Sequence, residues 1–253
     1  MLQRHGSQQS RSGLEGHGLL QSPAEWEVRN ATLAVTLGDL IVKYCDESGA
    51  KALDVGCQHG ELTDRLAQLT GLVWTGAEPD LLQETTSPSG ARLVPGFAHD
   101  LPFGDNEFDV INFANVFEHV APAARTPSLG ALYRVLRPAG ILVGQLPNPY
   151  FPIESHSRLP FFGWVPRRWQ PIYWRLSPTG WDFEAAHFFS VTVEDLRQVA
   201  EGVGFNTVLI RTFNYPPEAV PQAVRWAARL HNKLDIFPWS WQFVFRKPLH
   251  REL

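Results

Sequence analysis

The sequence predicts an α/β fold in which a doubly wound, mostly parallel sheet of seven strands is covered by helices on both faces. Two observations support this prediction. Short apolar strands alternate with amphipathic helical stretches along most of the 253 residues. The composition, 44% hydrophobic and 19% charged, fits one substantial core, and we find no internal repeat. We therefore expect a single domain over residues 23–253.

The first half of the chain supplies four of the strands. Apolar residues recur at helical spacing from Leu33 to Tyr44 and predict a helix over residues 23–45. A second helix is predicted over residues 61–69, and a short one after Pro79. The four strands are expected at residues 51–55, 72–77, 91–94 and 108–113.

The middle of the chain continues the alternation. Thr126 followed by Pro127 is a good N-cap and first-turn pair, so a helix is expected to begin there. Pro138 and Gly140 should end this helix. A fifth strand is predicted over residues 141–146.

The C-terminal third contains a further helix and the last two strands. Thr192 and Asp195 have the spacing of a capping box, and Gly204 should close the helix that follows. The strands are expected at residues 208–213 and 241–245.

Two segments interrupt this pattern. Residues 150–189 are rich in aromatic residues and prolines without any regular period, which predicts an irregular insertion after the fifth strand. Residues 216–238 are predicted to form a helical insertion in which Arg225, Arg229 and Lys233 recur every four residues. Insertions at the carboxyl edge of such a sheet lie where ligands bind, so we expect the first segment to form a lid or an acceptor pocket. The alternative is a small auxiliary core that covers the edge of the sheet.

Composition disfavours several classes of protein. A net charge of −4 and a pI near 6.1 give no global electrostatic reason to bind nucleic acid. No apolar stretch approaches the roughly 20 residues of a membrane-spanning helix. Residues 1–22 have no apolar signal region and predict a disordered tail on a cytoplasmic protein. The only cysteines, Cys45 and Cys57, are too few for a disulfide framework.

The most informative stretch is the turn after the first strand. Asp54 lies near the end of that strand, and Gly56 and Gly60 let the backbone approach a ligand closely. Glu78, at the end of the second strand, stands where a carboxylate accepts hydrogen bonds from ribose hydroxyls in doubly wound folds. Together the turn and this acid predict a cofactor that carries a nucleoside.

The spacing of the glycines argues against a dinucleotide. A pyrophosphate site needs three glycines in the pattern G-x-G-x-x-G, and here Glu61 occupies the third glycine position. Its carboxylate would repel a pyrophosphate. A nicotinamide-dependent oxidoreductase is therefore disfavoured, and a cofactor without phosphates suits the turn better.

At these residues the sequence resembles the class I S-adenosylmethionine-dependent methyltransferases, especially the branch that acts on small molecules. The likeness runs in order through short motifs at residues 53–60, 76–79, 101–103, 108–110, 118–120, 136–140 and 241–248. The resemblance implies a Rossmann-like fold, S-adenosyl-L-methionine as the cofactor, and a last strand that is antiparallel to its neighbours.

The resemblance also assigns roles to individual residues. The cofactor-binding residues that it implies are Asp54, Gly56, Cys57, Gly60, Glu78, Pro79, Phe97, Ala98 and Asn115. Among them, the turn would surround the methionine part of the cofactor and Glu78 would hold the ribose. Phe97 and Ala98 would flank the adenine. Asn115 would lie near the sulfonium.

Two positions depart from the family's pattern. Gln58 stands where the middle glycine is usual, and Phe97 replaces an acid that can accept a hydrogen bond from the adenine amino group. Backbone atoms can make these contacts instead, and the ring of Phe97 can stack on adenine.

Methyl transfer needs alignment of the reacting atoms, exclusion of water and, for a hydroxyl acceptor, a general base. His119, just past the fourth strand, is the first candidate base; alternatively, it and Glu118 merely open a helix. His156, inside the aromatic insertion, is the second candidate. We expect no metal site, because the potential ligands in this region have no recognised spacing. These ligands are Glu154, His156, Asp182 and His187.

The expected function is transfer of a methyl group to an oxygen, with nitrogen as the second choice, of a small molecule. The acceptor is expected to be aromatic, glycosylated or lipid-linked, with Arg167 and Arg168 meeting an anionic group. The basic helix is either a solvated face or, with Trp239 and Trp241 nearby, a peripheral membrane contact. The alternative is a non-catalytic protein of the same fold that binds the cofactor or a partner protein.

Overall fold

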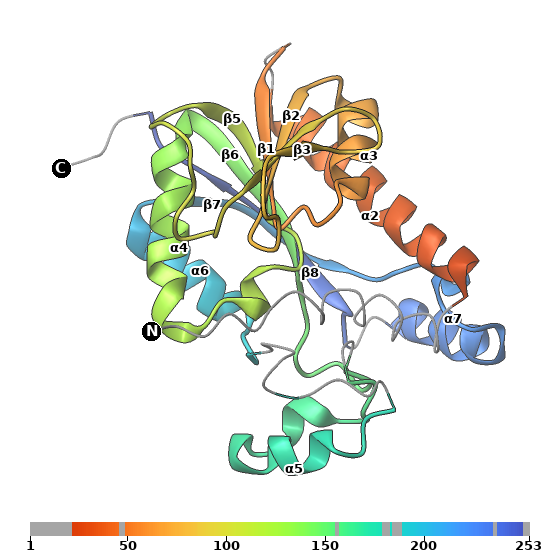
Figure 1. Ribbon diagram of the computed structural model, residues 1–253. Helices are drawn as coiled ribbons and strands as arrows, with labels where there is room; N and C mark the ends of the chain where they lie inside the picture. The colour runs from red at the N-terminus through yellow and green to blue at the C-terminus, as the bar shows by residue number, and fades with distance from the viewer. Residues whose placement is uncertain are drawn as a thin grey trace.

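An eight-stranded sheet forms the centre of the computed structural model, which describes residues 22–45, 49–154, 157–178, 183, 189–234 and 237–249. The order of the strands is β3-β4-β2-β1-β5-β6-β8-β7 (Figure 1). The strands are β1 (Lys51–Val55), β2 (Val73–Glu78), β3 (Thr85–Thr86), β4 (Arg92–Pro95), β5 (Phe108–Asn112), β6 (Leu136–Pro147), β7 (Asn206–Phe213) and β8 (Ser240–Arg246). Strands β4, β2, β1, β5 and β6 are parallel, whereas β8 runs antiparallel to β6 and β7. The expected reversal of the last strand is therefore confirmed.

Helices cover both faces of the sheet (Figure 1). The α-helices are α2 (Pro23–Tyr44), α3 (Glu61–Thr70), α4 (Pro122–Val135), α5 (Gln170–Trp174), α6 (Val193–Val203) and α7 (Arg225–Leu234). Side chains of α2 and α3, such as Leu37 and Leu66, pack on one face, and those of α4 and α6, such as Leu132 and Leu196, pack on the other. Two buried cores therefore enclose the sheet, as expected for a doubly wound fold.

The sheet has one strand more than the seven that the sequence predicts. The extra strand is β3, whose two threonines pair antiparallel with β4 and are both exposed. A two-residue exposed strand leaves no hydrophobic pattern in the sequence, so periodicity could not reveal it. The short helix expected after Pro79 is also wrong, because residues 79–84 form turns and bends.

Helix α4 begins earlier than the sequence predicts. It starts at Pro122, so Thr126 and Pro127 lie inside it and Thr126 is not its N-cap. The helix ends at Val135 instead of near Pro138, and β6 begins directly at Leu136. The pairing of β6 with β5 shifts register between Phe108 and Val110, where β6 begins irregularly.

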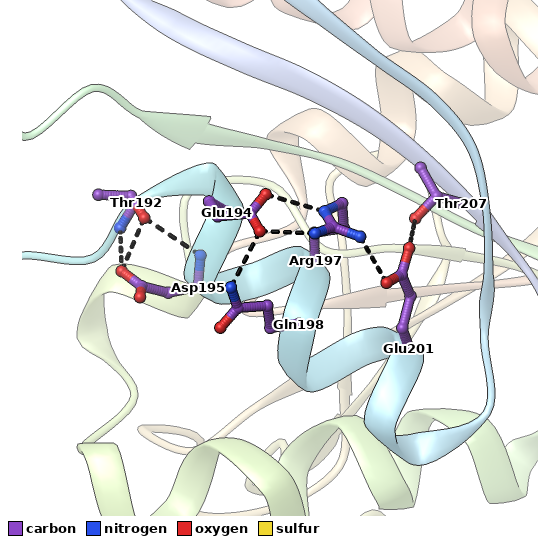
Figure 2. A network of polar contacts seen from close by, with 7 residues as sticks. All are labelled: Thr192, Glu194, Asp195, Arg197, Gln198, Glu201 and Thr207. Carbon is purple, nitrogen blue, oxygen red and sulfur yellow. Dashed lines mark hydrogen bonds and ion pairs between the residues drawn. The ribbon is translucent and has the colours of Figure 1, made fainter.

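The predicted cap of α6 is confirmed. Thr192 accepts a hydrogen bond from the N–H of Asp195, whose carboxylate accepts one from the N–H of Thr192 (Figure 2). Gly204 ends the helix in the left-handed conformation. Arg197 bridges Glu194 and Glu201 on the exposed side of the same helix (Figure 2). This network fixes a helix that covers the sheet and lies away from the candidate site.

The aromatic insertion leaves the sheet after β6 and projects below it in the view of Figure 1. Its described part contains three short helices, η2 (Phe162–Trp164), η3 (Arg167–Trp169) and α5. Leu159, Phe162 and Trp174 form a small buried cluster of their own. The insertion therefore has a separate core, although its aromatic content alone did not predict any regular structure. Two further short helices, η4 (Pro217–Ala219) and η5 (Gln222–Val224), precede α7.

No helix in the described ranges is long and apolar enough to span a bilayer. Residues 1–21, which make up nearly all of the predicted tail, lie outside these ranges.

Candidate functional site

Three parallel strands bring the predicted site residues to one edge of the sheet. Asp54 pairs with Gly76 on one side and with Asn112 on the other, so the carboxyl ends of β1, β2 and β5 lie level. The turn of residues 56–60 follows β1 at this edge, and Glu78 ends β2 beside it. Ligands of doubly wound folds bind at this edge of the sheet.

Left-handed backbone and close packing require glycine in the turn. Gly56 has φ +79°, and a Cβ there would lie 2.5 Å from a methyl group of Val116. Gly60, the N-cap of α3, has φ +84°, and a Cβ there would lie 2.6 Å from Ser87. The N–H of Gly56 donates to the carbonyl of Ala77 at 2.8 Å and ties the turn to β2. The two glycines read from the sequence are therefore needed by the fold of the turn.

Glu78 links the turn to the second strand. Its carboxylate accepts a hydrogen bond from the N–H of Gln58 at 2.9 Å and another from the N–H of Asp80 at 3.3 Å. Burial raises the pKa of this carboxyl, and the two backbone N–H groups oppose the rise. A carboxylate has about four lone-pair positions, so two further acceptor positions remain for a pair of hydroxyls.

Asp54 is more deeply buried than its expected role suggests. One of its carboxylate oxygens accepts from the hydroxyl of Thr63 at 2.6 Å, and the other accepts from the side-chain amide of Asn112 at 2.7 Å. Burial raises the pKa of Asp54, and these two hydrogen bonds lower it. These contacts hold β1 against α3 and β5. Direct contact between Asp54 and a cofactor stays a prediction.

Cys57 fills the space between the turn and β2. Its side chain is buried, and a Cβ added to Gly76 would lie 2.5 Å from its sulfur. Burial, followed by the nearby Asp54 and Glu78, raises the pKa of the thiol. The thiol is therefore neutral, and Cys57 shapes the crevice by packing.

Gln58, the departure from the family's glycine pattern, adopts a left-handed conformation with φ +50°. A non-glycine residue in this conformation costs roughly 1–2 kcal/mol. Its side chain is exposed, and its backbone N–H makes the hydrogen bond to Glu78. The position therefore keeps the conformation that a glycine would adopt more easily.

The residues expected around an adenine lie on the neighbouring loops. Pro79 follows Glu78 directly and is exposed. The ring of Phe97 is 55% exposed, and its backbone forms a bridge with Asp100. Ala98 is partly buried against the core below the sheet edge. An exposed ring in this place is available for stacking, which suits the role expected for Phe97.

A polar cluster on β6 escaped the sequence analysis. The side-chain amide of Gln145 donates to the carbonyl oxygen of Asn115 at 3.2 Å and to the hydroxyl of Tyr215 at 2.8 Å. Asn115, predicted near the sulfonium, has φ +57°. Its backbone N–H donates a hydrogen bond to the backbone carbonyl of Gln145. The carbonyl oxygen of the Gln145 side chain is buried and has no donor among the described residues. The one available signal was a glutamine within an otherwise apolar strand.

Of the two predicted bases, His119 lies within the described residues and His156 does not. His119 lies on η1 (Phe117–His119), just beyond β5 at the carboxyl edge, and is partly exposed. Its N–H donates to the carbonyl of Val116. His156 lies outside the described residues, as do Asp182 and His187. The described ranges contain no cluster of three or more side chains that could hold a metal.

These residues together fit a nucleoside cofactor without phosphates. The edge of the sheet beside the turn carries the backbone of Gly56 and the acceptor oxygens of Glu78, and the loop after β4 exposes the side chain of Phe97. The acid Glu61 opens α3, at the position where a dinucleotide would place its pyrophosphate. The geometry thus defines an α/β protein whose sheet edge suits a nucleoside-bearing ligand.

Comparison with known sequences finds similarity to methyltransferases. Residues 53–144 match the family described as a methyltransferase domain. An uncharacterized methyltransferase of Synechocystis sp. is 36% identical over 95 residues, which cover 37% of this chain and 45% of that protein. A demethylmenaquinone methyltransferase of Staphylococcus saprophyticus is 28% identical over 180 residues, which cover 66% of this chain and 75% of that protein.

A solved structure has the same fold. It is a complex between the Haloferax volcanii Trm112 methyltransferase activator and a putative methyltransferase, with a TM-score of 0.62 and 14% identity over 97% of this chain and 100% of the matched chain. The match over residues 53–144 and the shared fold together support a class I S-adenosylmethionine-dependent methyltransferase. The cofactor of that class is S-adenosylmethionine, which carries a nucleoside and no phosphate.

Proposed function

We propose that the protein transfers the methyl group of S-adenosylmethionine to an oxygen of a small-molecule acceptor. The observation that carries this proposal is the contact between Glu78 and the turn, in which the N–H of Gln58 lies 2.9 Å from the carboxylate. This contact holds the acceptor oxygens of Glu78 beside the left-handed Gly56, where a ribose diol and a methionine chain can both be bound. When bound, S-adenosylmethionine supplies an electrophilic methyl group on a positively charged sulfur.

Residues on the far side of the crevice serve the acceptor. His119 is the base that we assign to take up the proton released when a hydroxyl oxygen forms its new bond to the methyl carbon. Gln145 holds the side chain of Asn115 and is a positioning residue.

The acceptor that suits this edge is aromatic or lipid-linked. The described part of the insertion exposes Trp164 and Trp169 at the carboxyl edge, together with the cations Arg167 and Arg168. Aromatic side chains bind flat rings and apolar chains, and arginines bind anionic groups. The name of the staphylococcal relative, demethylmenaquinone methyltransferase, is compatible with such an acceptor.

Two measurements test the proposal. Calorimetry should detect binding of S-adenosylhomocysteine and none of NAD, and S-adenosylmethionine labelled in its methyl group should give a labelled product with an extract of small molecules. His119→Ala should lower kcat at least about tenfold, leave the Kd of S-adenosylhomocysteine unchanged and remove the acid limb of the pH profile. Binding without any labelled product would support the non-catalytic alternative.

A further inference from the structure

Helix α7 exposes apolar and cationic side chains on one face. Trp226, Leu230 and Leu234 recur every four residues and are 68%, 50% and 55% exposed. Arg229 and Lys233 are exposed on the same face, because residues three and four apart are neighbours on a helix. The opposite side of the helix, which includes the buried Ala228, packs against the protein. A helix whose outer face combines Trp and Leu with Arg and Lys is typical of one that lies in a membrane interface.

The described part of the aromatic insertion repeats this composition. Its exposed large apolar side chains are Phe161, Trp164, Trp169, Ile172 and Leu176, and its exposed cations are Arg167, Arg168 and Arg175. None of these three cations forms an ion pair within the described ranges. The segment therefore offers both apolar surface and unneutralised positive charge.

Ring contacts connect the insertion with α7 and the residues that follow it. The ring of Trp164 lies 6.5 Å from that of Phe237, just after α7, and Phe151 lies 5.3 Å from His231 of the same helix. In the view of Figure 1, α5 of the insertion lies below the sheet and α7 lies to the right of its lower end. We call the exposed side chains of residues 161–176 and of α7 the docking face.

Charge separates the docking face from the rest of the molecule. The whole chain carries −4, yet residues 161–176 contain three arginines and no acid, and α7 contains Arg225, Arg229, Lys233 and no acid, with Arg225 lying 4.0 Å from Glu25 of α2. The nearest described acid to Arg229 is Glu218 at 3.9 Å, an exposed pair that neutralises little. Positive charge is therefore concentrated where the apolar side chains are exposed, which complements an anionic surface.

We propose that the docking face seats the protein on an anionic lipid bilayer. The tryptophans and aliphatic side chains enter the headgroup region, and the arginines and Lys233 contact the anionic headgroups. Exposed Ile172, Leu176, Leu230 and Leu234 gain little from contact with nucleic acid, whereas they gain from burial in lipid. The proposal does not rest on methyl transfer, because lipid binding can be measured without cofactor or acceptor.

Sedimentation of the full chain with lipid vesicles tests this inference. We expect the protein to bind vesicles of phosphatidylcholine with phosphatidylglycerol and to bind phosphatidylcholine alone at least about tenfold more weakly. The triple variant Trp226→Ser, Leu230→Ser and Leu234→Ser should lose about tenfold or more of the affinity. The double variant Arg229→Glu and Lys233→Glu should lose at least as much, since each cation near an anionic surface contributes about 1 kcal/mol, or roughly fivefold.

Matched controls lie on elements outside the docking face. Val35→Ser, Val42→Ser and Leu69→Ser remove three exposed apolar side chains from α2 and α3. Lys43→Glu and Lys51→Glu reverse two exposed cations, which matches the charge change of the test pair. Both controls should keep vesicle binding within about twofold. An equal loss in these controls, no sedimentation with anionic vesicles, or a preference for single-stranded RNA over the vesicles would overturn the proposal.

Discussion

The turn after β1 and the aromatic insertion lie at the same edge of the sheet, yet they are held in opposite ways. The turn is fixed by backbone hydrogen bonds to its neighbour strand, such as those from Gly56 to Ala77 and from Gln58 to Glu78. The insertion is fixed by a small cluster around Phe162 and Trp174, and it exposes most of its other aromatic side chains. The conformation of the turn therefore depends on the sheet, and the conformation of the insertion depends on its own small core.

This difference separates cofactor binding from acceptor recognition. A change in the turn moves β2 and the crevice together, because the same backbone atoms form both. A change in the insertion leaves the hydrogen bonds of the crevice intact. We therefore expect variants of the two regions to affect different measurements.

The largest effect is expected for Gly76→Ala on β2. A Cβ at this position would lie 2.5 Å from the sulfur of Cys57 and 2.6 Å from a methyl group of Leu93. Such overpacking should lower the free energy of unfolding by about 3 kcal/mol and weaken S-adenosylhomocysteine binding. Denaturant melts and calorimetry measure the two effects. Gly130→Ala in α4 is the control, because nothing lies within 4 Å of its Cβ, and it should be neutral or stabilising.

Gly163→Ala is the matching change in the insertion. Its Cβ would lie 1.8 Å from the carbonyl oxygen of Pro149, so the segment must shift where it leaves the sheet. Trypsin should then cleave at the exposed Arg167, Arg168 and Arg175 about tenfold faster, because local opening becomes easier. The Kd of S-adenosylhomocysteine should stay within about twofold of the unchanged protein. A loss of cofactor binding as large as that of Gly76→Ala would show that the two regions are not independent.

Glu78→Ala sharpens the assignment of the ribose site. The change removes the acceptor of the Gln58 N–H and the acceptor oxygens proposed for the ribose hydroxyls. We expect binding of S-adenosylhomocysteine to weaken by about 1–3 kcal/mol, roughly ten- to hundredfold. Calorimetry measures this loss. Glu61→Gln on α3 is the control, and it should leave the affinity for S-adenosylhomocysteine within about threefold. Unchanged affinity in Glu78→Ala would refute the ribose assignment.

The cofactor edge could be predicted from the sequence because its signals are local. Two glycines with positive φ and an acid at the end of the next strand are sufficient to define the turn, and parallel pairing then fixes where they meet. The capping box of Thr192 and Asp195 is a local signal of the same kind.

The remaining features depend on contacts between distant parts of the chain. Gln145 and Tyr215 are 70 residues apart, and only the packing of β6 against the segment after β7 brings them together. Helix α4 starts at Pro122 although Thr126 and Pro127 form the better local start, so tertiary packing outweighs the cap there. The arrangement of the insertion follows from burial of Phe162 and Trp174, which no periodic pattern announces.

A smaller effect is expected from pH on cofactor binding. The ionised form of Glu78 is the better acceptor for ribose hydroxyls, and burial raises its pKa from 4.5. Affinity for S-adenosylhomocysteine should therefore be highest above the raised pKa of Glu78 and fall as the pH drops through it. The buried Asp54 also has a raised pKa, so Glu78→Gln is needed as the reference. Calorimetry across this range should show no such fall in Glu78→Gln.

The smallest effect is expected for Gln58→Gly, which restores the usual glycine of the family. Gln58 has φ +50°, and relief of this strain is worth roughly 1–2 kcal/mol, whereas the extra freedom of glycine in the unfolded chain offsets about 0.5–1 kcal/mol. The free energy of unfolding should rise by at most about 1.5 kcal/mol. Affinity for S-adenosylhomocysteine should stay the same or improve slightly, because the N–H that bonds Glu78 is retained. Ala139→Gly, at φ +66° in β6 and away from the turn, is the control and should show the same gain in stability with no change in affinity. A tenfold loss of affinity in Gln58→Gly would mean that the side chain of Gln58 itself contacts the cofactor.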